Sequence, residues 1–258
     1  MILTIIGSGN VATHLALALK NAGHIVNQIY SRNISYAQLL AGKVNAEAIS
    51  DLSMMNTTSD LYLIAVSDKA IAQVVEKMKQ VSGIVAHTAG SVSISVLEKF
   101  SSYGSFYPFQ TFTGEREIDM KNVPVFVEGN SSETGQRLYD IALQISNKVE
   151  KADEKKRFIL HISAVFSCNF VNHLYTISQN ILEESGLDFS YLEPLINETT
   201  QKALNIKPYF AQTGPARRND VDVIQFHIDK LKEHESYQDL YRFLSESIVK
   251  MYTNSMEN

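Results

Sequence analysis

The first thirteen residues, MILTIIGSGNVAT, constrain the fold of this chain more than any other stretch. An apolar run over residues 2–6 leads into Gly7, Gly9 and Ala12 at the spacing G-x-G-x-x-A, and an Ala-rich segment over residues 11–22 follows. This pattern between a strand and a helix is typical of a dinucleotide-binding unit. Gly7 would permit the tight turn, Gly9 would let a pyrophosphate approach the backbone, and Ala12 would let the helix pack closely on the sheet. The alternative is a tight turn that binds nothing.

Apolar runs and helical patterns alternate along the first 150 residues. The expected strands are 2–6, 24–30, 60–68, 83–86 and 123–127, with 148–150 as a candidate closing strand, and the expected helices are 11–22, 35–48, 69–79 and 133–146. Such alternation predicts an α/β fold with a doubly wound parallel sheet. Beyond residue 150 we find only helical patterns, at 154–184, 190–204, 218–233 and 236–252. We therefore expect a Rossmann domain over residues 1–150 and an all-α domain over residues 151–258.

Composition and charge exclude several other classes of protein. The 258 residues carry a formal net charge of −5 and no block rich in Lys or Arg, which disfavours a nucleic-acid partner. No apolar run approaches the roughly 20 residues that cross a bilayer, and no basic flank marks a signal peptide, so we expect a cytoplasmic protein. Cys168 is the one cysteine, which excludes an internal disulfide, and the scattered histidines indicate no metal site.

The end of the second expected strand bears on the choice of cofactor. An NAD site usually places a carboxylate there for the ribose 2′-hydroxyl, whereas this chain has Ser31 and Arg32. A guanidinium beside a hydroxyl suits a 2′-phosphate, so the pair favours NADP; the alternative is a solvated loop arginine. Asp68, at the end of the expected strand 60–68, is expected to cap the following helix; the alternative is a catalytic role. The predicted cofactor-binding residues are Gly7, Ser8, Gly9, Asn10, Val11, Ser31, Arg32, Ala65, Val66, Ser67, His87 and Thr88.

Taken together, the motifs of the chain resemble a bacterial family of Rossmann-like proteins with a C-terminal domain of unknown function, DUF2520, often labelled coenzyme F420-dependent NADP oxidoreductases. The resemblance implies an NADP domain followed by a helical domain like that of 6-phosphogluconate dehydrogenase, commonly a dimerisation surface. The first part is also similar to pyrroline-5-carboxylate reductases. Two departures are Asn219, where the family pattern has glycine, and Tyr107, where related sequences often carry histidine. The motifs that carry the resemblance lie at residues 5–12, 30–32, 65–68, 87–91, 107–112, 164–170 and 213–220.

Polar residues on the long helix over 154–184 are the candidates for chemistry. We expect this helix to be buried because apolar residues cover much of its circumference. In the related β-hydroxyacid dehydrogenases a lysine and an asparagine on this helix serve catalysis, but no lysine follows Lys156 in the matching part. We therefore predict His161 and Asn169 as catalytic. Asn172, His173 and Arg218 are predicted to bind substrate. The alternative for each of these residues, and for His161 and Asn169, is a purely structural role.

These features predict an NADP(H)-dependent oxidoreductase, expected to be a homodimer. It would transfer a hydride to or from a small carbonyl, imine or hydroxy acid. The alternative is an NADP-binding sensor without turnover, which the missing lysine favours.

Overall fold

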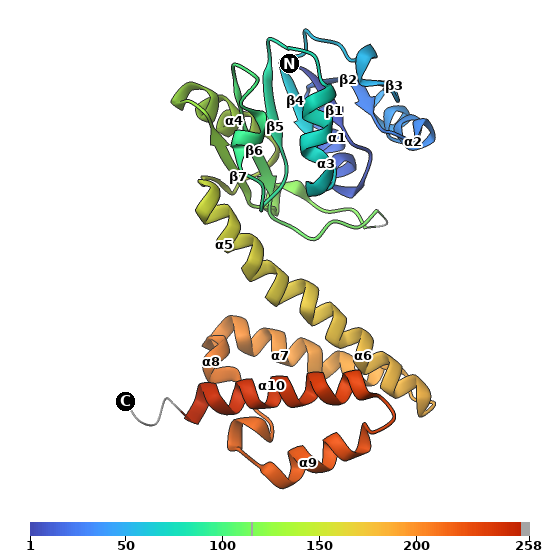
Figure 1. Ribbon diagram of the computed structural model, residues 1–258, viewed down its shortest axis with the longest axis vertical. Coiled ribbons are helices and arrows are strands. Elements are labelled where there is room, and N and C mark those ends of the chain that lie inside the picture. Colours follow the sequence, from blue (N-terminus) through green and yellow to red (C-terminus); the bar gives the residue numbers. More distant parts are fainter. Residues whose placement is uncertain (115, 254–258) are drawn as a thin grey trace. The chain divides into compact units, whose positions relative to one another are not determined.

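The computed structural model describes residues 1–114 and 116–253. The chain divides into two compact units, Met1–Asn169 and Phe170–Asn258 (Figure 1).

The first unit is built on one eight-stranded sheet, whose order is β3-β2-β1-β4-β5-β6-β7-β8. Neighbouring strands are parallel except β6 and β7, which are antiparallel. The order turns at β1, which lies between β2 and β4, so the sheet is doubly wound as the sequence predicts. The strands are β1 (Ile2–Ile6), β2 (Ile25–Tyr30), β3 (Glu47–Ile49), β4 (Leu61–Ile64), β5 (Ile84–His87), β6 (Tyr103–Pro108), β7 (Val125–Gly129) and β8 (Val149–Lys151).

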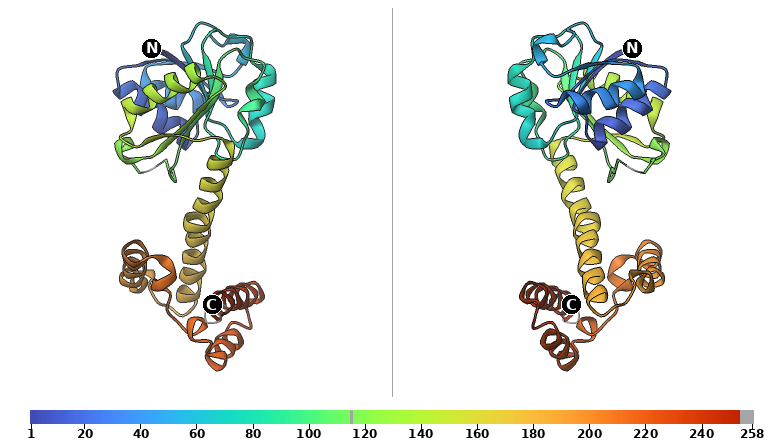
Figure 2. Two further views of the ribbon diagram at one scale, coloured as in Figure 1. Left: turned by 90° about the vertical axis from the view of Figure 1, so that its left-hand side faces the viewer. Right: turned by 90° about the vertical axis from the view of Figure 1, so that its right-hand side faces the viewer.

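Helices cover both faces of this sheet (Figure 2). Alternate strand residues face opposite sides, so that Leu61 and Leu63 join one apolar cluster while Tyr62 and Ile64 join the other. Burial on both faces is typical of parallel strands. The first cluster includes residues of α1 (Asn10–Asn21), α2 (Ile34–Val44) and α4 (Ser132–Ile145), and the second includes residues of α3 (Asp68–Lys77) and of the short 3₁₀ helix Ile94–Leu97.

Two strands were not expected from the sequence. β3 falls at the end of the helix predicted over 35–48, because α2 stops at Val44 and Asn45 turns the chain in the left-handed conformation, with φ 58°. β6 coincides with an aromatic stretch whose proline obscured the strand pattern. The pairing of β5 with β6 ends at His87 and Ser105. Pro108 is the last residue of β6 and lies beyond that pairing, so its missing N–H removes no hydrogen bond between these two strands.

The helix α5 (Glu154–Ala164) belongs to the first unit. Asp153 caps it, and six residues with π-helical bonding, Val165–Phe170, lead into α6 (Val171–Glu184). The expectation that this long helix is buried is wrong for the chain alone, since Arg157 is its one buried residue among those described. Phe158 and Ile159 are 50% and 52% exposed because few elements pack around the helix. The units divide after Asn169, whereas the expected boundary near residue 150 precedes α5.

The second unit is entirely helical over its described residues. Its loop before α9 contains Asn219 in the left-handed conformation, with φ 53°, which accounts for the glycine of the family pattern at this position. Asp220 then caps α9. Besides α6, the helices are α7 (Glu193–Ile206), α8 (Pro208–Ala211), α9 (Val221–Lys230) and α10 (Glu235–Thr253). In the described parts of the two units, no helix is both long and apolar enough to cross a membrane.

Candidate active site

The turn after β1 has two glycines that are needed for different reasons. Gly7 has φ +128°, and a Cβ there would lie 2.2 Å from the carbonyl oxygen of Ala65, so the protein itself requires glycine at this position. Gly9 has an ordinary φ of −80°, and a Cβ there would meet no protein atom within 4 Å. Packing within the chain therefore does not explain Gly9, whereas close approach of a ligand to the backbone does.

A cavity of about 330 Å³ opens beside this turn. Its walls come from the carboxyl ends of β1, β2 and β4 and from one side of α3, the place where doubly wound sheets bind ligands. Eight of the twelve predicted cofactor residues line it. The lining residues are Gly7, Ser8, Gly9, Tyr30, Ser31, Arg32, Leu52, Ala65, Val66, Ser67, Ala70, Gln73, Val74 and Lys77.

Two helix N-termini meet at this cavity without side-chain caps. α1 begins after Gly9 and α3 after Ser67, and neither residue gives its helix a capping hydrogen bond. The other helices that start in this unit, α2, α4 and α5, are capped by Asn33, Ser131 and Asp153. The first N–H groups of α1 and α3 are thus left for another acceptor, and their positive dipole ends favour an anion such as a phosphate.

The remaining four predicted cofactor residues lie outside the cavity lining. Asn10 donates its side-chain amide to the carbonyl of Phe112 over 3.0 Å, and Val11 packs against the core. His87 is fully buried, and Thr88 is buried near the carbonyl of Ile64. Their part in binding a cofactor stays a prediction.

A second group of side chains gathers where β5 and β6 end. The phenol oxygen of Tyr107 lies 3.2 Å from Nδ1 of His161 on α5. Gly90 leaves the room for this contact, since a Cβ there would lie 2.8 Å from the Tyr107 ring and 3.0 Å from Cβ of His161. The sequence pattern predicts a role for His161, whereas Tyr107 stands out in the sequence only as a departure from related sequences. The contact joins residues 54 positions apart in the chain, so it has no local sequence signal.

Burial fixes the protonation of two groups here. Burial, followed by the charge of Asp68, raises the pKa of Tyr107 to about 12, so its phenol keeps its proton at neutral pH. Burial, followed by the charge of Arg157, lowers the pKa of His87 to about 4, so this imidazole is neutral. Nδ1 of His87 accepts the N–H of Ala89, which leaves the proton on Nε2.

Asp68 has a different role from the expected helix cap. Ser67 occupies the N-cap position of α3, and the Asp68 carboxylate instead accepts a hydrogen bond of 2.5 Å from the Ser91 hydroxyl. The contact ties the start of α3 to the loop after β5.

Arg157 anchors α5 to the sheet. Its side chain is 0% exposed, pairs with Glu128 on β7 and donates to the carbonyl of Val92 over 2.9 Å. Because His161 follows four residues later on the same side of the helix, this anchor also sets the position of His161.

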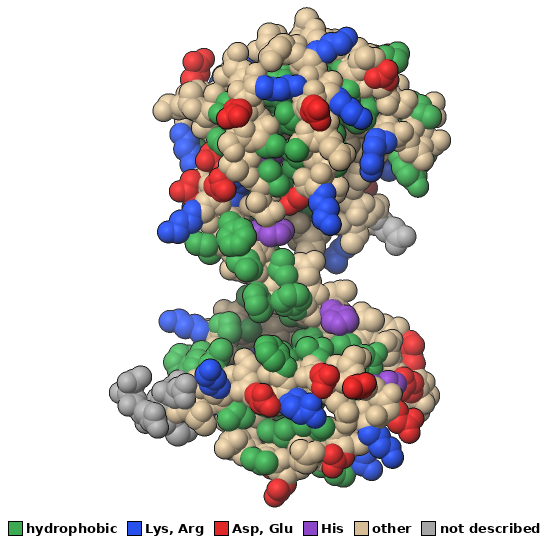
Figure 3. Space-filling model, viewed as in Figure 1, with side chains coloured by type: hydrophobic (Ala, Val, Ile, Leu, Met, Phe, Trp, Pro, Cys, Tyr) green, Lys and Arg blue, Asp and Glu red, His purple; other side chains and the backbone are tan. Residues whose placement is uncertain are grey.

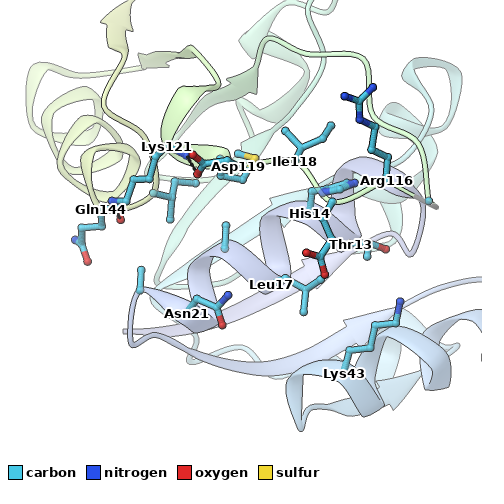
Figure 4. A pocket seen from close by; sticks show the side chains of 16 residues that line it. Thr13, His14, Leu17, Asn21, Lys43, Arg116, Ile118, Asp119, Lys121 and Gln144 are labelled. Carbon is cyan, nitrogen blue, oxygen red and sulfur yellow. Dashed lines mark hydrogen bonds between the residues drawn. The ribbon is translucent and has the colours of Figure 1, made fainter.

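A larger cavity of about 700 Å³ runs along the outer side of α1 (Figure 4). It is lined by α1, by Lys43, by the segment around Ile118 and by the end of α4, and its charged groups have both signs. Its lining contains none of the predicted site residues and no residue of the glycine turn, so we place the candidate site at the smaller cavity.

Four other predicted residues are exposed. Asn169 lies in the π-helical segment, Asn172 and His173 lie in the first turn of α6, and Arg218 precedes α9. Arg218 forms no ion pair with Asp220 or Asp222 in the described structure. Their roles in catalysis or substrate binding stay predictions.

Comparison with known proteins places the chain in a family. The model of a Rossmann-like domain matches residues 1–109, and that of a domain of unknown function, DUF2520, matches residues 123–248. A crystal structure from Bacteroides fragilis, of a protein provisionally named an NADP oxidoreductase, is 41% identical, with a TM-score of 0.91, and covers 96% of this chain and 98% of that one. The chain belongs to the Rossmann-like DUF2520 family. The resemblance inferred from its motifs is confirmed.

More distant matches to this DUF2520 protein include two proteins named as reductases. Pyrroline-5-carboxylate reductase from Aquifex aeolicus is 30% identical over 95 residues. That match spans 37% of this chain and 36% of the reductase, so it covers about a third of the relative's length. An imine reductase from Streptomyces aurantiacus covers 96% of each chain with a TM-score of 0.66 and 13% identity, a likeness that shows the fold alone.

Proposed function

We propose that this DUF2520 protein is an NADP(H)-dependent oxidoreductase acting on a small carbonyl, imine or hydroxy acid. The observation that carries the proposal is the 330 Å³ cavity, which gathers Gly9, Arg32 and Ser67 from three separate parts of the chain at the carboxyl edge of the sheet. The names of two relatives support it, since one is provisionally named an NADP oxidoreductase and the other is a pyrroline-5-carboxylate reductase.

The residues present fit a dinucleotide phosphate. The open space beside Gly9 admits a pyrophosphate to the backbone, and the uncapped N-termini of α1 and α3 offer N–H donors. Ser31 and Arg32, at the end of β2, would hold the 2′-phosphate.

The Tyr107–His161 pair is suited to handling the substrate proton. When bound, NADPH supplies a hydride to the substrate carbon, and the substrate oxygen or nitrogen gains a proton. Tyr107 keeps its proton at neutral pH and can donate it to that heteroatom, and His161, within hydrogen-bond distance of the phenol, can restore it. In the oxidation direction the same groups take the proton up.

We also propose that the protein is a cytoplasmic homodimer. No residue of α7 is buried, and Leu204 and Phe243 in the helical unit are 75% and 68% exposed. Figure 3 shows apolar side chains at the surface over this unit. Contiguous exposed apolar surface usually marks an interface, and a second copy of the chain would cover it. Sedimentation of the purified protein at several concentrations tests this proposal.

The enzymatic proposal is tested by NADPH consumption. The purified protein is assayed against panels of cyclic imines, ketones and 2-keto acids, with Tyr107→Phe as the matched variant. Turnover that the variant loses, while its affinity for NADPH stays unchanged, supports the proposal. Tight NADPH binding without turnover of any panel would favour the non-catalytic sensor instead.

A further inference from the structure

The cavity assigned to the dinucleotide is lined by a second cationic side chain, Lys77, which belongs to no motif recognised in the sequence. Among its fourteen lining residues, Arg32 and Lys77 are the charged ones, and both are positive. Arg32 follows β2, whereas Lys77 is the last residue of α3, so the two charges come from different walls. The cavity is therefore a cationic site with two independent contributors.

Neither cation is used by the protein itself. Over residues 1–114 and 116–253, the side chains of Arg32 and Lys77 form no ion pair or hydrogen bond with another residue. Lys79, two residues further on, is by contrast held by the carbonyl of Ser53. Two exposed cations that line one cavity without a protein partner are arranged for an anion.

One face of α3 offers a surface on which the adenosine half of a dinucleotide can pack. Ala70, Gln73, Val74 and Lys77 follow at spacings of three, four and seven residues, which places them on one face of the helix. Ala70 and Val74 give an apolar strip, and Leu52 adds to it. An adenine ring can pack on this strip, and Lys77 then stands at its far end.

From this arrangement we infer that Lys77 is a second residue that binds the 2′-phosphate. Together with Arg32 it sets the preference for NADP over NAD. A phosphate monoester carries nearly two negative charges at neutral pH, so one guanidinium leaves it partly uncompensated, and an ammonium on another wall of the same cavity supplies the second positive charge. This inference rests on the proposed function and adds to it a specificity-determining residue.

A purely structural explanation of Lys77 makes a different prediction. A lysine in the last turn of a helix stabilises the helix dipole, whatever the cavity binds. In that case Lys77→Met would lower the melting temperature slightly and leave ligand preference unchanged.

The test measures the binding of 2′,5′-ADP and 5′-AMP by calorimetry, because these fragments differ in the 2′-phosphate alone. The variants are Arg32→Met, Lys77→Met, Lys77→Arg and Lys148→Met, the last removing an equal charge just before β8, which forms an edge of the sheet away from β1, β2 and β4. We expect the wild type to prefer 2′,5′-ADP, and Lys77→Met to reduce that preference roughly tenfold. Lys77→Arg should retain most of it, and Lys148→Met should leave it unchanged.

Two other results separate failure of the inference from failure of the proposed function. If the wild type prefers 2′,5′-ADP and Arg32→Met removes the preference while Lys77→Met does not, the role of Lys77 is refuted and the NADP site stands. If the wild type binds neither fragment, the NADP site fails and the inference fails with it. Melting temperatures of all variants show whether each remains folded.

Discussion

The phenol of Tyr107 and the imidazole of His161 are hydrogen-bonded at 3.2 Å, although 54 residues separate them in the chain. The contact joins the end of β6 to α5, and Arg157 holds α5 in place one turn earlier. A proton-donating group and a group that can reprotonate it therefore meet in the same unit that holds the cavity at the glycine turn.

The first prediction concerns this pair. Tyr107→Phe removes the hydroxyl and keeps the ring, so kcat should fall roughly a hundredfold to ten-thousandfold for a substrate that needs a proton. His161→Asn should lower kcat as well, with a changed pH profile. NADPH affinity should stay within about twofold of the wild type in both variants, as titration of NADPH fluorescence would show. A drop in stability without a selective loss of kcat would mean that the pair is structural.

The two glycines of the turn should respond in opposite ways to alanine. Gly7→Ala forces a Cβ onto the Ala65 carbonyl at a positive φ, and we expect a loss of about 1–3 kcal/mol in unfolding free energy. Gly9→Ala places its Cβ in open space, so it should cost less than about 1 kcal/mol. NADPH affinity should nevertheless fall at least tenfold in Gly9→Ala, because the added methyl occupies the approach of the pyrophosphate. Urea unfolding and NADPH titration of both variants measure the contrast, and unchanged NADPH affinity in Gly9→Ala would contradict it.

His87 should make stability depend on pH. Its folded-state pKa of about 4 lies below the ordinary 6.5, so the unfolded chain binds the extra proton between these values. The contribution of His87 to the free energy of unfolding is fully present above pH 6.5. It is lost as the pH falls towards 4, by up to about 3 kcal/mol. Unfolding curves of wild type and His87→Gln across this range isolate the effect. The difference between them should shrink as the pH falls, and a constant difference would count against a buried neutral imidazole.

Removing one partner of the Arg157–Glu128 ion pair should strongly lower the free energy of unfolding. Arg157→Met leaves the Glu128 carboxylate mostly buried without its partner, and we expect a loss of about 3–5 kcal/mol. Adding Glu128→Gln should recover part of this loss because the uncompensated charge is gone. Denaturation of the two single variants and the double variant gives the coupling energy; additive losses would show that the two side chains act separately.

Much of the first unit could be predicted from local sequence. The glycine turn, Ser31–Arg32 and Ala65–Ser67 are each read from a few consecutive residues, and the topology of a doubly wound sheet then brings them to one cavity. Tyr107 could not be assigned in this way, since its role depends on a contact with α5 that no local pattern encodes. Lys77 was missed for a similar reason, because a lysine in the last turn of a helix has an ordinary explanation until the cavity is seen.

The exposure of the long helix shows a different limit. Apolar residues such as Phe158 and Ile159 predict burial, yet they are exposed in a single chain. A hydrophobic pattern reports that a surface is to be covered, but it does not say whether the same chain or another covers it.

Thermal unfolding with NADPH, with NADH and without nucleotide tests the central claim most directly. A ligand that binds the folded state raises its stability by about 2.7 kcal/mol at a hundredfold excess over its dissociation constant. We predict a clear rise in melting temperature with NADPH and a smaller rise with NADH at the same concentration. The rise with NADPH should be reduced in Arg32→Met. No rise with either nucleotide would contradict the dinucleotide site and, with it, the proposed oxidoreductase.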